Sequence, residues 1–395
     1  MISDNLERSI SEPPENVLSP AELQRYARHL SMEEVGLPGQ RRLKASRVLV
    51  VGAGGLGSPA LMYLAAAGIG TLGVVDDDVV EVSNLQRQVI HGQSTLAMAK
   101  VDSARQRIAD LNPHTQVVTH RTRLTADNCQ QIISQYDLVV DGSDNFTTRY
   151  LVNDACFLLH RPCVWGSVSQ FHGQASVFCT PSGPCYRCLY PEPPPPHFAP
   201  SCEEGGVFGA VCATVASVQV TEAIKLIVGN GESLAGRLWL YDGSRAETQT
   251  KQLRKDPDCK LCGSNPTVHE VAEVRFTCSV PADPHCQVRT ISATELADRL
   301  GRRRVDDDDF LLLDVREPFE WEIVRIEGAQ LVPKTTLLES HLHLPREQEI
   351  IVYCKGGARS EDVARVLSQD NFRVSHLKGG VLAWVSDVEP HLRGY

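Results

Sequence analysis

Three features are missing from this sequence, and each absence excludes a class of protein. Acidic residues outnumber basic ones, 49 to 39, so the chain lacks the positive charge of a protein that binds nucleic acid or an anionic membrane. No apolar run comes near the length of about 20 residues that spans a bilayer. The N-terminus, MISDNLERSISEPPEN, lacks the basic and apolar segments of a secretory signal, and we expect a short disordered tail over residues 1–18.

Cysteine, by contrast, is abundant, and its count of 13 is odd. Without a signal peptide, such a count argues against a disulfide framework and for a reducing compartment, which we take to be the cytoplasm. Some of the thiols are then available for metal binding or catalysis. A length of 395 residues is too great for one ordinary hydrophobic core and indicates two domains.

Segments with strand and helix character alternate in two stretches of the chain, from Arg47 to about residue 144 and from about residue 288 onward. Such alternation predicts an α/β fold in which right-handed crossovers join the strands of mostly parallel sheets. Residues 250–287 are polar, contain prolines and show weak periodicity. We therefore expect a first domain over 19–270, a linker over 271–287 and a smaller α/β domain over 288–395.

The segment Gly52-Ala-Gly54-Gly55-Leu-Gly57 follows an expected strand and opens an expected helix. This is the setting of the G-x-G-x-x-G fingerprint, whose glycines let backbone amides approach phosphate groups at a helix N-terminus. Asp76 ends the next expected strand, where it can bond a ribose hydroxyl. These residues alone fit an NAD-dependent oxidoreductase as well as an enzyme that uses ATP.

Three charged residues favour ATP. Arg87, in the segment SNLQRQ, and Lys100 lie in the same unit as the fingerprint, and two fixed cations suit a triphosphate and its pyrophosphate leaving group. Asp144, in the segment DGSDN at the end of a later strand, can hold Mg²⁺ between phosphate oxygens. Each of these charges alone would be read as a solvated surface residue, so the prediction depends on their joint placement.

The segments GAGGLGSPALMYLAAAGIGTLGVVDDDVVEVSNLQRQVIH and DGSDNFTTRYLVNDAC closely resemble the MoeB/ThiF family of ubiquitin-activating-enzyme-like adenylyltransferases, over about residues 20–265. The resemblance implies a Rossmann-like domain that binds ATP. This domain would join AMP to the C-terminal carboxylate of a small β-grasp protein ending in Gly-Gly and release pyrophosphate. It also implies catalytic roles for Asp144, at the Mg²⁺, and Arg87, and a homodimer in which Arg28 reaches the site of the other protomer. The nucleotide-binding residues are then Gly52, Gly54, Gly55, Gly57, Asp76, Ser83, Asn84, Leu85, Gln86, Arg87, Lys100, Asp144, Asn145 and Arg28.

Two C-x-x-C pairs, Cys185 with Cys188 and Cys259 with Cys262, offer four thiolates in the number that suits a structural zinc ion. The distance between the pairs exceeds that of a compact zinc ribbon, so spacing alone leaves a redox pair or buried thiols open. The family resemblance favours zinc. It also implies that Cys202, in the segment APSCEEGGVFG, takes part in sulfur or acyl transfer. The remaining cysteines are interpreted as structural or incidental: Cys129, Cys156, Cys163, Cys179, Cys212, Cys278 and Cys286.

Cys354 ends another expected strand and begins a six-residue loop that opens an expected helix. Backbone amides of such a loop can converge on the sulfur as hydrogen-bond donors. With this loop, the segments LLLDVREPFEW, EGAQLVP and HLKGGVLAW resemble a rhodanese domain over about residues 288–395. The resemblance implies a persulfide on the catalytic Cys354. The persulfide loop consists of Cys354, Lys355, Gly356, Gly357, Ala358 and Arg359.

The two resemblances together imply an enzyme that adenylates a sulfur-carrier protein and converts its C-terminus to a thiocarboxylate. Such enzymes serve molybdopterin synthase or related sulfur carriers, with thiosulfate or a cysteine desulfurase as the sulfur donor. Three alternatives stay open from the residues. They are an NAD-dependent oxidoreductase, a plain thiosulfate sulfurtransferase with a degenerate first domain, and a non-catalytic docking platform for β-grasp proteins.

Overall fold

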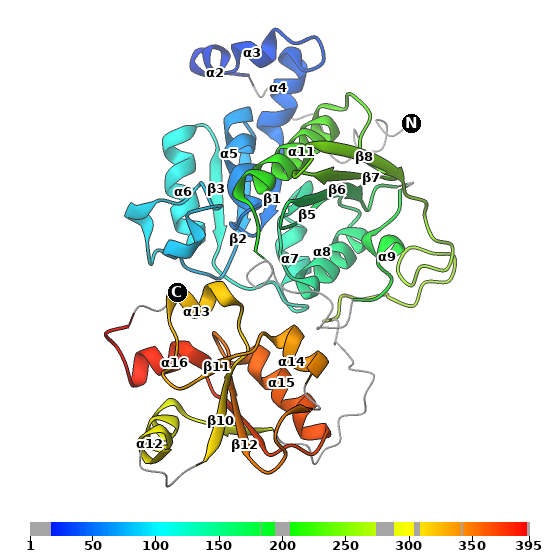
Figure 1. The fold of residues 1–395 in the computed structure, drawn as a ribbon. Coiled ribbons are helices and arrows are strands. Elements are labelled where there is room, and N and C mark those ends of the chain that lie inside the picture. Colours follow the sequence, from blue (N-terminus) through cyan, green and yellow to red (C-terminus); the bar gives the residue numbers. More distant parts are fainter. Residues whose placement is uncertain are drawn as a thin grey trace. The chain divides into compact units, whose positions relative to one another are not determined.

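The computed structural model describes residues 17–181, 183–193, 206–273, 288–303, 309–340 and 343–392. The chain separates into two compact units, Met1–Phe276 and Thr277–Tyr395 (Figure 1). Most of the expected tail and of the expected linker lies outside the described residues, although Leu18 is buried.

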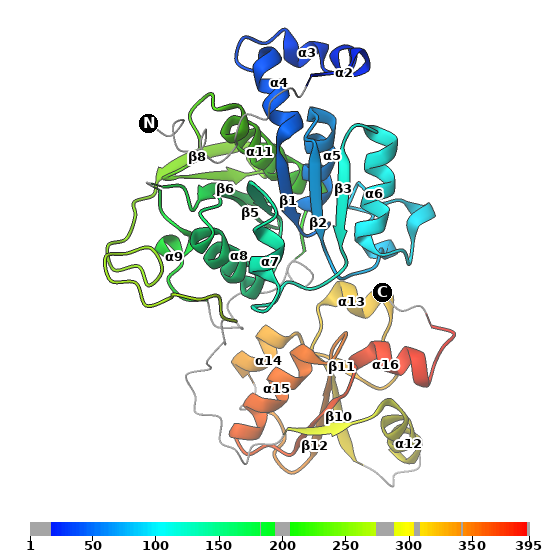
Figure 2. The same cartoon turned by 180° about the vertical axis from the view of Figure 1, so that it is seen from behind.

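An eight-stranded sheet forms the centre of the first unit, in the order β3-β2-β1-β4-β5-β6-β7-β8 (Figure 2). The strands from β3 to β5 are parallel, which confirms the predicted α/β fold. From β5 to β8 the neighbours are antiparallel. The strands are β1 (Arg47–Val51), β2 (Thr71–Val75), β3 (Gln116–His120), β4 (Leu138–Asp141), β5 (Cys163–Ser169), β6 (His172–Phe178), β7 (Arg237–Asp242) and β8 (Glu247–Gln252).

Helices cover both faces of this sheet because its central strands are apolar along their whole length. In β1, Val48 and Val50 pack into one core cluster, whereas Leu49 and Val51 point to the opposite face and join another. The first cluster contains residues of α4 (Gly36–Ala45), α5 (Gly57–Ala67), α6 (Lys100–Leu111) and α11 (Gly209–Val228). The second contains residues of α7 (Cys129–Ile133), α8 (Phe146–Leu158) and α9 (Tyr186–Leu189).

The first unit also contains two short N-terminal helices and a connection between β2 and α6. The helix expected around residues 21–30 is broken at Tyr26 into α2 (Pro20–Arg25) and α3 (Ala27–Leu30). Ser19 caps α2, and its hydroxyl accepts a hydrogen bond from Glu22 N–H, as the Ser-Pro signal indicates. Two short 3₁₀ turns, η1 (Val82–Asn84) and η2 (Gln93–Thr95), connect β2 to α6.

Helix α11 differs from a sequence expectation. It is long and apolar enough to cross a membrane, although we expected no apolar run to approach that length. In its most apolar window, 61% is buried, and its residues share a core with α4, α5 and the sheet. Core helices of globular proteins have the same length and composition.

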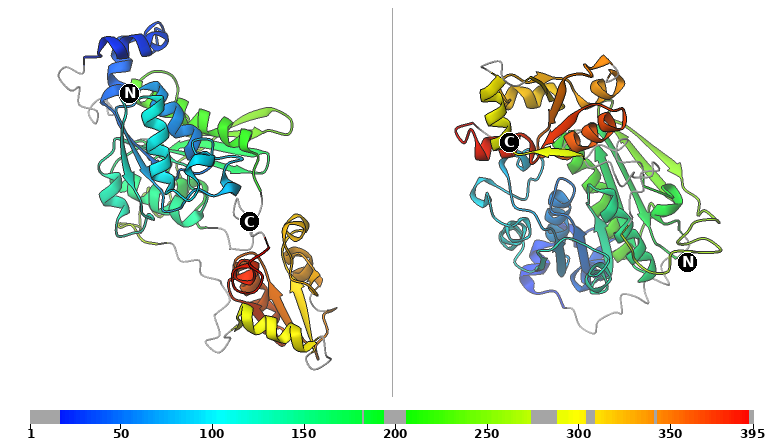
Figure 3. Two further views of the ribbon diagram at one scale, coloured as in Figure 1. Left: turned by 90° about the vertical axis from the view of Figure 1, so that its left-hand side faces the viewer. Right: turned by 90° about the horizontal axis from the view of Figure 1, so that it is seen from below.

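The second unit contains a five-stranded sheet in the order β11-β10-β12-β13-β9, in which all neighbours are parallel. Helices pack on both faces and form two core clusters (Figure 3). The strands are β9 (Arg289–Ile291), β10 (Phe310–Asp314), β11 (Gln330–Leu331), β12 (Glu349–Tyr353) and β13 (Val374–Leu377). The helices are α12 (Ala293–Arg303), α13 (Pro318–Ile323), α14 (Lys334–Ser340), α15 (Ala358–Gln369) and α16 (Gly380–Asp387).

Candidate functional site

The fingerprint loop turns tightly between β1 and α5. Gly52 has a φ of +86°, in the left-handed region that favours glycine, and its N–H donates to Val75 O at 2.9 Å. Gly57 allows the closest approach in the loop, because a Cβ built there would lie 1.8 Å from Gly52 O. The N-terminal end of α5 can therefore lie against the turn only with glycine at this position.

A cavity of about 300 Å³ opens beside this loop, at the carboxyl ends of β1, β2 and β4. This is the place where parallel α/β sheets bind their ligands. The structure brings eight of the predicted nucleotide residues to its wall: Gly52, Gly54, Gly55, Asp76, Arg87, Lys100, Asp144 and Asn145.

Hydrogen bonds and an ion pair hold Asp76 and Lys100 in place. The Asp76 carboxylate accepts hydrogen bonds from Ala53 N–H at 2.8 Å and Asp78 N–H at 2.9 Å. Burial raises the pKa of Asp76, while the nearby Lys100 and these two amides act in the opposite direction. Lys100 Nζ forms an ion pair with Asp78 at 2.8 Å. An oriented carboxylate thus lies next to a buried cation.

The loop before α8 supplies the opposite wall of the cavity. Asp144 is exposed there, as a group that binds a cation at a cavity wall must be. Asn145 caps α8, and its Oδ1 accepts a hydrogen bond from Thr148 N–H at 2.9 Å. Arg149, on the same helix, is buried and donates to Ser143 O through Nε and Nη2 at 3.3 and 3.2 Å.

Several predicted residues do not line this cavity. Gly57 serves the turn, and Asn84 is buried with its Oδ1 accepting from Glu81 N–H at 3.1 Å. Arg28 is exposed on α3. The predicted residues that the described cavity wall lacks are Gly57, Ser83, Asn84, Leu85, Gln86 and Arg28.

Other residues reach the cavity although sequence reasoning missed them. Gln88 and Ser143 are buried, and Gln88 Oε1 has no hydrogen-bond partner in the part of the chain that the structure describes. Both lie inside quoted motifs, SNLQRQ and DGSDN, but carry no charge that would single them out. Cys212, interpreted as incidental, also lines the cavity from α11. Polar or charged lining residues that were also missed include Thr122 and Arg123, which follow β3 together with Leu124, and Arg149.

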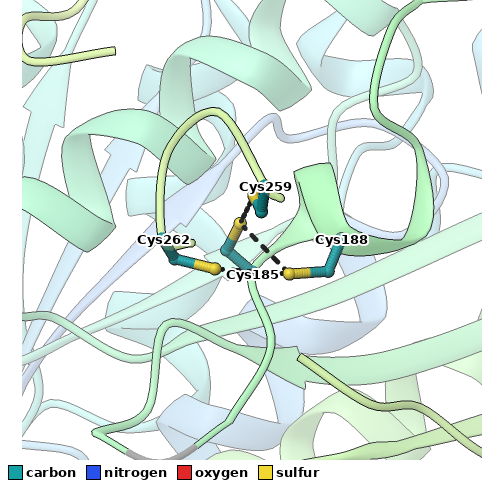
Figure 4. A group of neighbouring side chains, drawn as sticks. All are labelled: Cys185, Cys188, Cys259 and Cys262. Carbon is teal, nitrogen blue, oxygen red and sulfur yellow. Dashed lines mark hydrogen bonds between the residues drawn. The ribbon is translucent and has the colours of Figure 1, made fainter. Parts of the chain in front are cut away.

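The four cysteines of the two C-x-x-C pairs converge (Figure 4). Their Sγ atoms all lie within 4.8 Å of one another. The Cys185–Cys259, Cys188–Cys262 and Cys185–Cys188 separations are 3.5, 3.3 and 3.9 Å. Tetrahedral zinc with bonds of about 2.3 Å needs sulfur atoms about 3.8 Å apart. The four thiols therefore fit zinc in number, type and spacing, with no ligand position left for catalysis.

Helix α8 connects this cysteine cluster to the nucleotide cavity. Arg187, between the first two cysteines, makes a buried bidentate ion pair with Asp154 at 2.8 and 2.7 Å. Asn153 Oδ1 accepts a hydrogen bond from Tyr186 N–H at 2.7 Å. Both partners are on α8, whose N-terminal residues line the cavity.

In the second unit, Cys354 follows β12 and is 1% exposed. Its sulfur accepts a hydrogen bond from Gly357 N–H at 3.1 Å and lies 3.5 Å from the Ser360 hydroxyl. Gly357 has a φ of +104°, which turns the chain into α15. From the other side, the N–H groups of Val381 and Leu382 in α16 donate to the carbonyls of Cys354 and Lys355. The thiol thus lies at the N-terminus of a twelve-residue helix, as predicted for the loop.

The arginine of this loop is tied to a carboxylate. Arg359 donates two hydrogen bonds of 2.7 Å to Glu320 of α13, and both side chains are mostly buried. The positive charge of Arg359 is therefore balanced within the unit. Cys202, Cys278 and Cys286 lie outside the described residues, so the structure does not bear on the predicted role of Cys202.

Comparisons with known proteins match both units. A model of the ThiF family matches residues 26–261, and a model of the rhodanese-like domain matches residues 292–387. A probable adenylyltransferase/sulfurtransferase MoeZ from Mycobacterium tuberculosis is 48% identical over 97% of each chain. The adenylyltransferase and sulfurtransferase MOCS3 of Drosophila ananassae is 40% identical, over 94% of this chain and 85% of its own. The crystal structure of E. coli MccB with MccA-N7isoASN covers 66% of this chain and 80% of that chain, with a TM-score of 0.56; at 20% identity it shows the fold alone.

Proposed function

This chain belongs to the ThiF family and carries a rhodanese-like domain after its ThiF domain, and we propose that it activates and then thiolates the C-terminus of a small sulfur-carrier protein. Its relatives named adenylyltransferase and sulfurtransferase extend over both domains, so the chain is an enzyme with both activities. The carrier would be a β-grasp protein ending in Gly-Gly. The observation that carries the proposal is the cavity in which the fingerprint glycines, Asp76, Arg87, Lys100 and Asp144 meet.

In the first reaction, ATP and the carrier's C-terminal carboxylate are the substrates. One carboxylate oxygen attacks the α-phosphorus, and the bond from that phosphorus to the pyrophosphate oxygen breaks. Arg87 and Lys100 at the cavity wall are suited to stabilise the charge of the phosphates and of the departing pyrophosphate. Asp76 would bind the ribose. Asp144 would hold Mg²⁺, which neutralises charge on phosphate oxygens when bound.

In the second reaction, sulfur replaces AMP. The terminal sulfur of a Cys354 persulfide attacks the acyl carbon, and AMP leaves with the bonding electron pair. The product is an acyl disulfide that joins the carrier to Cys354. A thiolate, for which we propose Cys202, then attacks Cys354 Sγ and releases the carrier as a thiocarboxylate. The resulting protein disulfide requires an external dithiol, which is oxidised as the two cysteines are reduced.

The same proposal includes the oligomeric state of the enzyme, its metal ion, its cellular compartment and its sulfur donor. Arg28 is exposed and does not line the cavity of its own chain, which agrees with a homodimer in which it serves the partner's site. The four clustered cysteines would hold a structural zinc ion. We place the enzyme in the cytoplasm, with thiosulfate or a cysteine desulfurase as the sulfur donor. The carrier would be that of molybdopterin synthase or a related sulfur carrier.

The test is the mass of a candidate carrier ending in Gly-Gly after incubation with the full chain, Mg-ATP, thiosulfate and a dithiol. We expect a mass change equal to the exchange of one oxygen for one sulfur, and no such change with Cys354→Ala. Carrier that is adenylated but receives sulfur from no donor would refute the second step alone. If no carrier were adenylated while thiosulfate sulfur still reached cyanide, the plain sulfurtransferase would be the correct function.

A further inference from the structure

A buried histidine lies behind the fingerprint loop and is not part of the cavity wall. His91 is 8% exposed, in the connection between η1 and η2. Its Nε2 lies 3.0 Å from Ala53 O, and its Nδ1 lies 2.8 Å from the hydroxyl oxygen of Ser103 in α6.

The proton on the His91 ring can be assigned from its partners. A carbonyl oxygen only accepts, so Nε2 carries a proton and donates it to Ala53 O. Burial lowers the pKa of His91, and the nearby Lys100 adds to this effect, so the ring is neutral at pH 7. Nδ1 is then an acceptor, for which the Ser103 hydroxyl is the donor. Ser103 Oγ also lies 3.0 Å from Thr95 Oγ1, whose own hydroxyl donates to Gly92 O at 3.0 Å.

The contact fixes the direction of one peptide group in the fingerprint. Ala53 O also accepts a hydrogen bond from the Ser58 hydroxyl at 3.1 Å, while Ala53 N–H donates to Asp76 at 2.8 Å. In a planar trans peptide, Gly54 N–H points opposite to Ala53 C=O. It therefore points away from His91 and Ser58, neither of which lines the cavity.

Gly54 itself does line the cavity. Among the described residues, its N–H has no hydrogen-bond acceptor, since the bonds of this loop come from Gly52, Ala53 and Ser58. An unpaired backbone donor next to Arg87 and Lys100 is suited to an anionic oxygen. The direction of this donor depends on what holds Ala53 O on the far side.

We propose that His91 is a positioning residue for ATP, which acts through Ala53 to direct Gly54 N–H toward the phosphates. The inference rests on the proposed function, because it requires ATP in this cavity. His91 touches neither the nucleotide nor the carrier. Its loss should weaken ATP binding and leave the chemical step nearly intact once ATP is bound.

The experiment measures carrier-dependent exchange of pyrophosphate into ATP as a function of ATP concentration, using the full chain. For His91→Leu we expect KM for ATP to rise roughly fivefold, the effect of one lost hydrogen bond, with kcat nearly unchanged. His91→Gln should restore KM, because its Nε2 can reach Ala53 O. The control is Thr115→Val, which removes a buried hydrogen bond of 2.9 Å to Ile69 O at the amino end of β3. It should lower the melting temperature without changing KM.

Unchanged KM in folded His91→Leu would overturn the inference while leaving the proposed function intact. Equal impairment of the Gln and Leu variants would also overturn it, because His91 would then only fill space. If His91→Leu does not fold, His91→Asn replaces it, since that amide is too short to reach Ala53. A wild-type chain without carrier-dependent exchange would overturn both the inference and the proposed function.

Discussion

Replacing Gly57 with alanine should weaken nucleotide binding and lower the free energy of unfolding at the same time. The added Cβ would lie 1.8 Å from Gly52 O, whereas real Cβ atoms essentially never approach another heavy atom closer than 3.0 Å. The two atoms must separate by more than about 1 Å, and the nearest obstacle is backbone rather than a movable side chain. An overpacked position of this kind costs about 1–3 kcal/mol or more.

The opposing effect is smaller. Alanine in a helix is more favourable than glycine by about 0.5–1 kcal/mol, and Gly57 is the first residue of α5. The clash therefore exceeds the helical gain, and we expect a net loss of about 1–2 kcal/mol. When the Cβ and Gly52 O move apart, the fingerprint loop shifts by about 1 Å. Its backbone amides then no longer lie at hydrogen-bonding distance from the phosphates, so ATP binding should fall more than a hundredfold.

Two other glycines provide matched controls. At Gly92 a Cβ meets nothing within 4 Å and the φ is −149°, so Gly92→Ala should preserve both stability and ATP binding. At Gly54 the nearest contact is 3.8 Å, to the side chain of Gln88, but the residue lines the cavity. Gly54→Ala should therefore keep its melting temperature and lose ATP affinity, because the methyl group enters the space that phosphates need.

Calorimetric unfolding and ATP titration of the three variants measure both quantities. A Gly57→Ala protein with wild-type melting temperature and wild-type ATP affinity would falsify the reasoning from the loop geometry. A Gly54→Ala protein that binds ATP normally would refute the placement of phosphates against this part of the loop. Destabilisation of Gly92→Ala equal to that of Gly57→Ala would show that any alanine in this region is harmful.

Three further predictions concern the other features of the chain. Cys354→Ala should still release pyrophosphate when carrier and Mg-ATP are added but form no thiocarboxylate; loss of pyrophosphate release would contradict separate roles for the two domains. Cys259→Ser should lower the zinc content found by elemental analysis and the melting temperature of the first unit by several degrees, because it removes one of four ligands. An unchanged zinc content would refute the four-cysteine site. Burial lowers the pKa of His91 and His120 below the ordinary value of 6.5, so the unfolded chain takes up protons first as the pH falls. The melting temperature of the first unit should therefore drop between about pH 7.5 and about pH 5.5, and the drop should be smaller when both histidines are replaced by glutamine.

The parallel half of the first sheet could be predicted from the sequence, but the antiparallel half could not. Parallel strands are buried on both faces and read as continuous apolar runs bounded by glycine, as in RVLVV. The hairpin between β5 and β6 has no comparable signal. Only Gln170 and Phe171 connect these strands, and Gln170 has a φ of +52° at a position where asparagine or glycine is usual. The fold accepts an unfavourable turn residue because long strands pair on both sides of it.

The charged residues of the site were predictable because fold topology brings them together. Asp76 and Asp144 follow the carboxyl ends of β2 and β4, and the ends of parallel strands meet at one edge of the sheet. The partners of charged residues were not predictable in the same way. Glu320 is 39 residues from Arg359 in the sequence, and nothing in either segment indicates that the loop arginine is already paired.

The least predictable part of the site consists of neutral polar atoms. Gln88 lines the cavity, and its buried Oε1 has no partner in the described structure; a buried polar atom left unpaired costs about 1–3 kcal/mol. A ligand whose donor pairs with this oxygen would remove that free-energy cost. ATP and the proposed Gly-Gly tail both offer donors, so part of the binding energy would come from an atom that no charge pattern identifies. Gln88→Met, which removes this amide, should therefore weaken binding while raising stability, which is the opposite of what a purely structural role would produce.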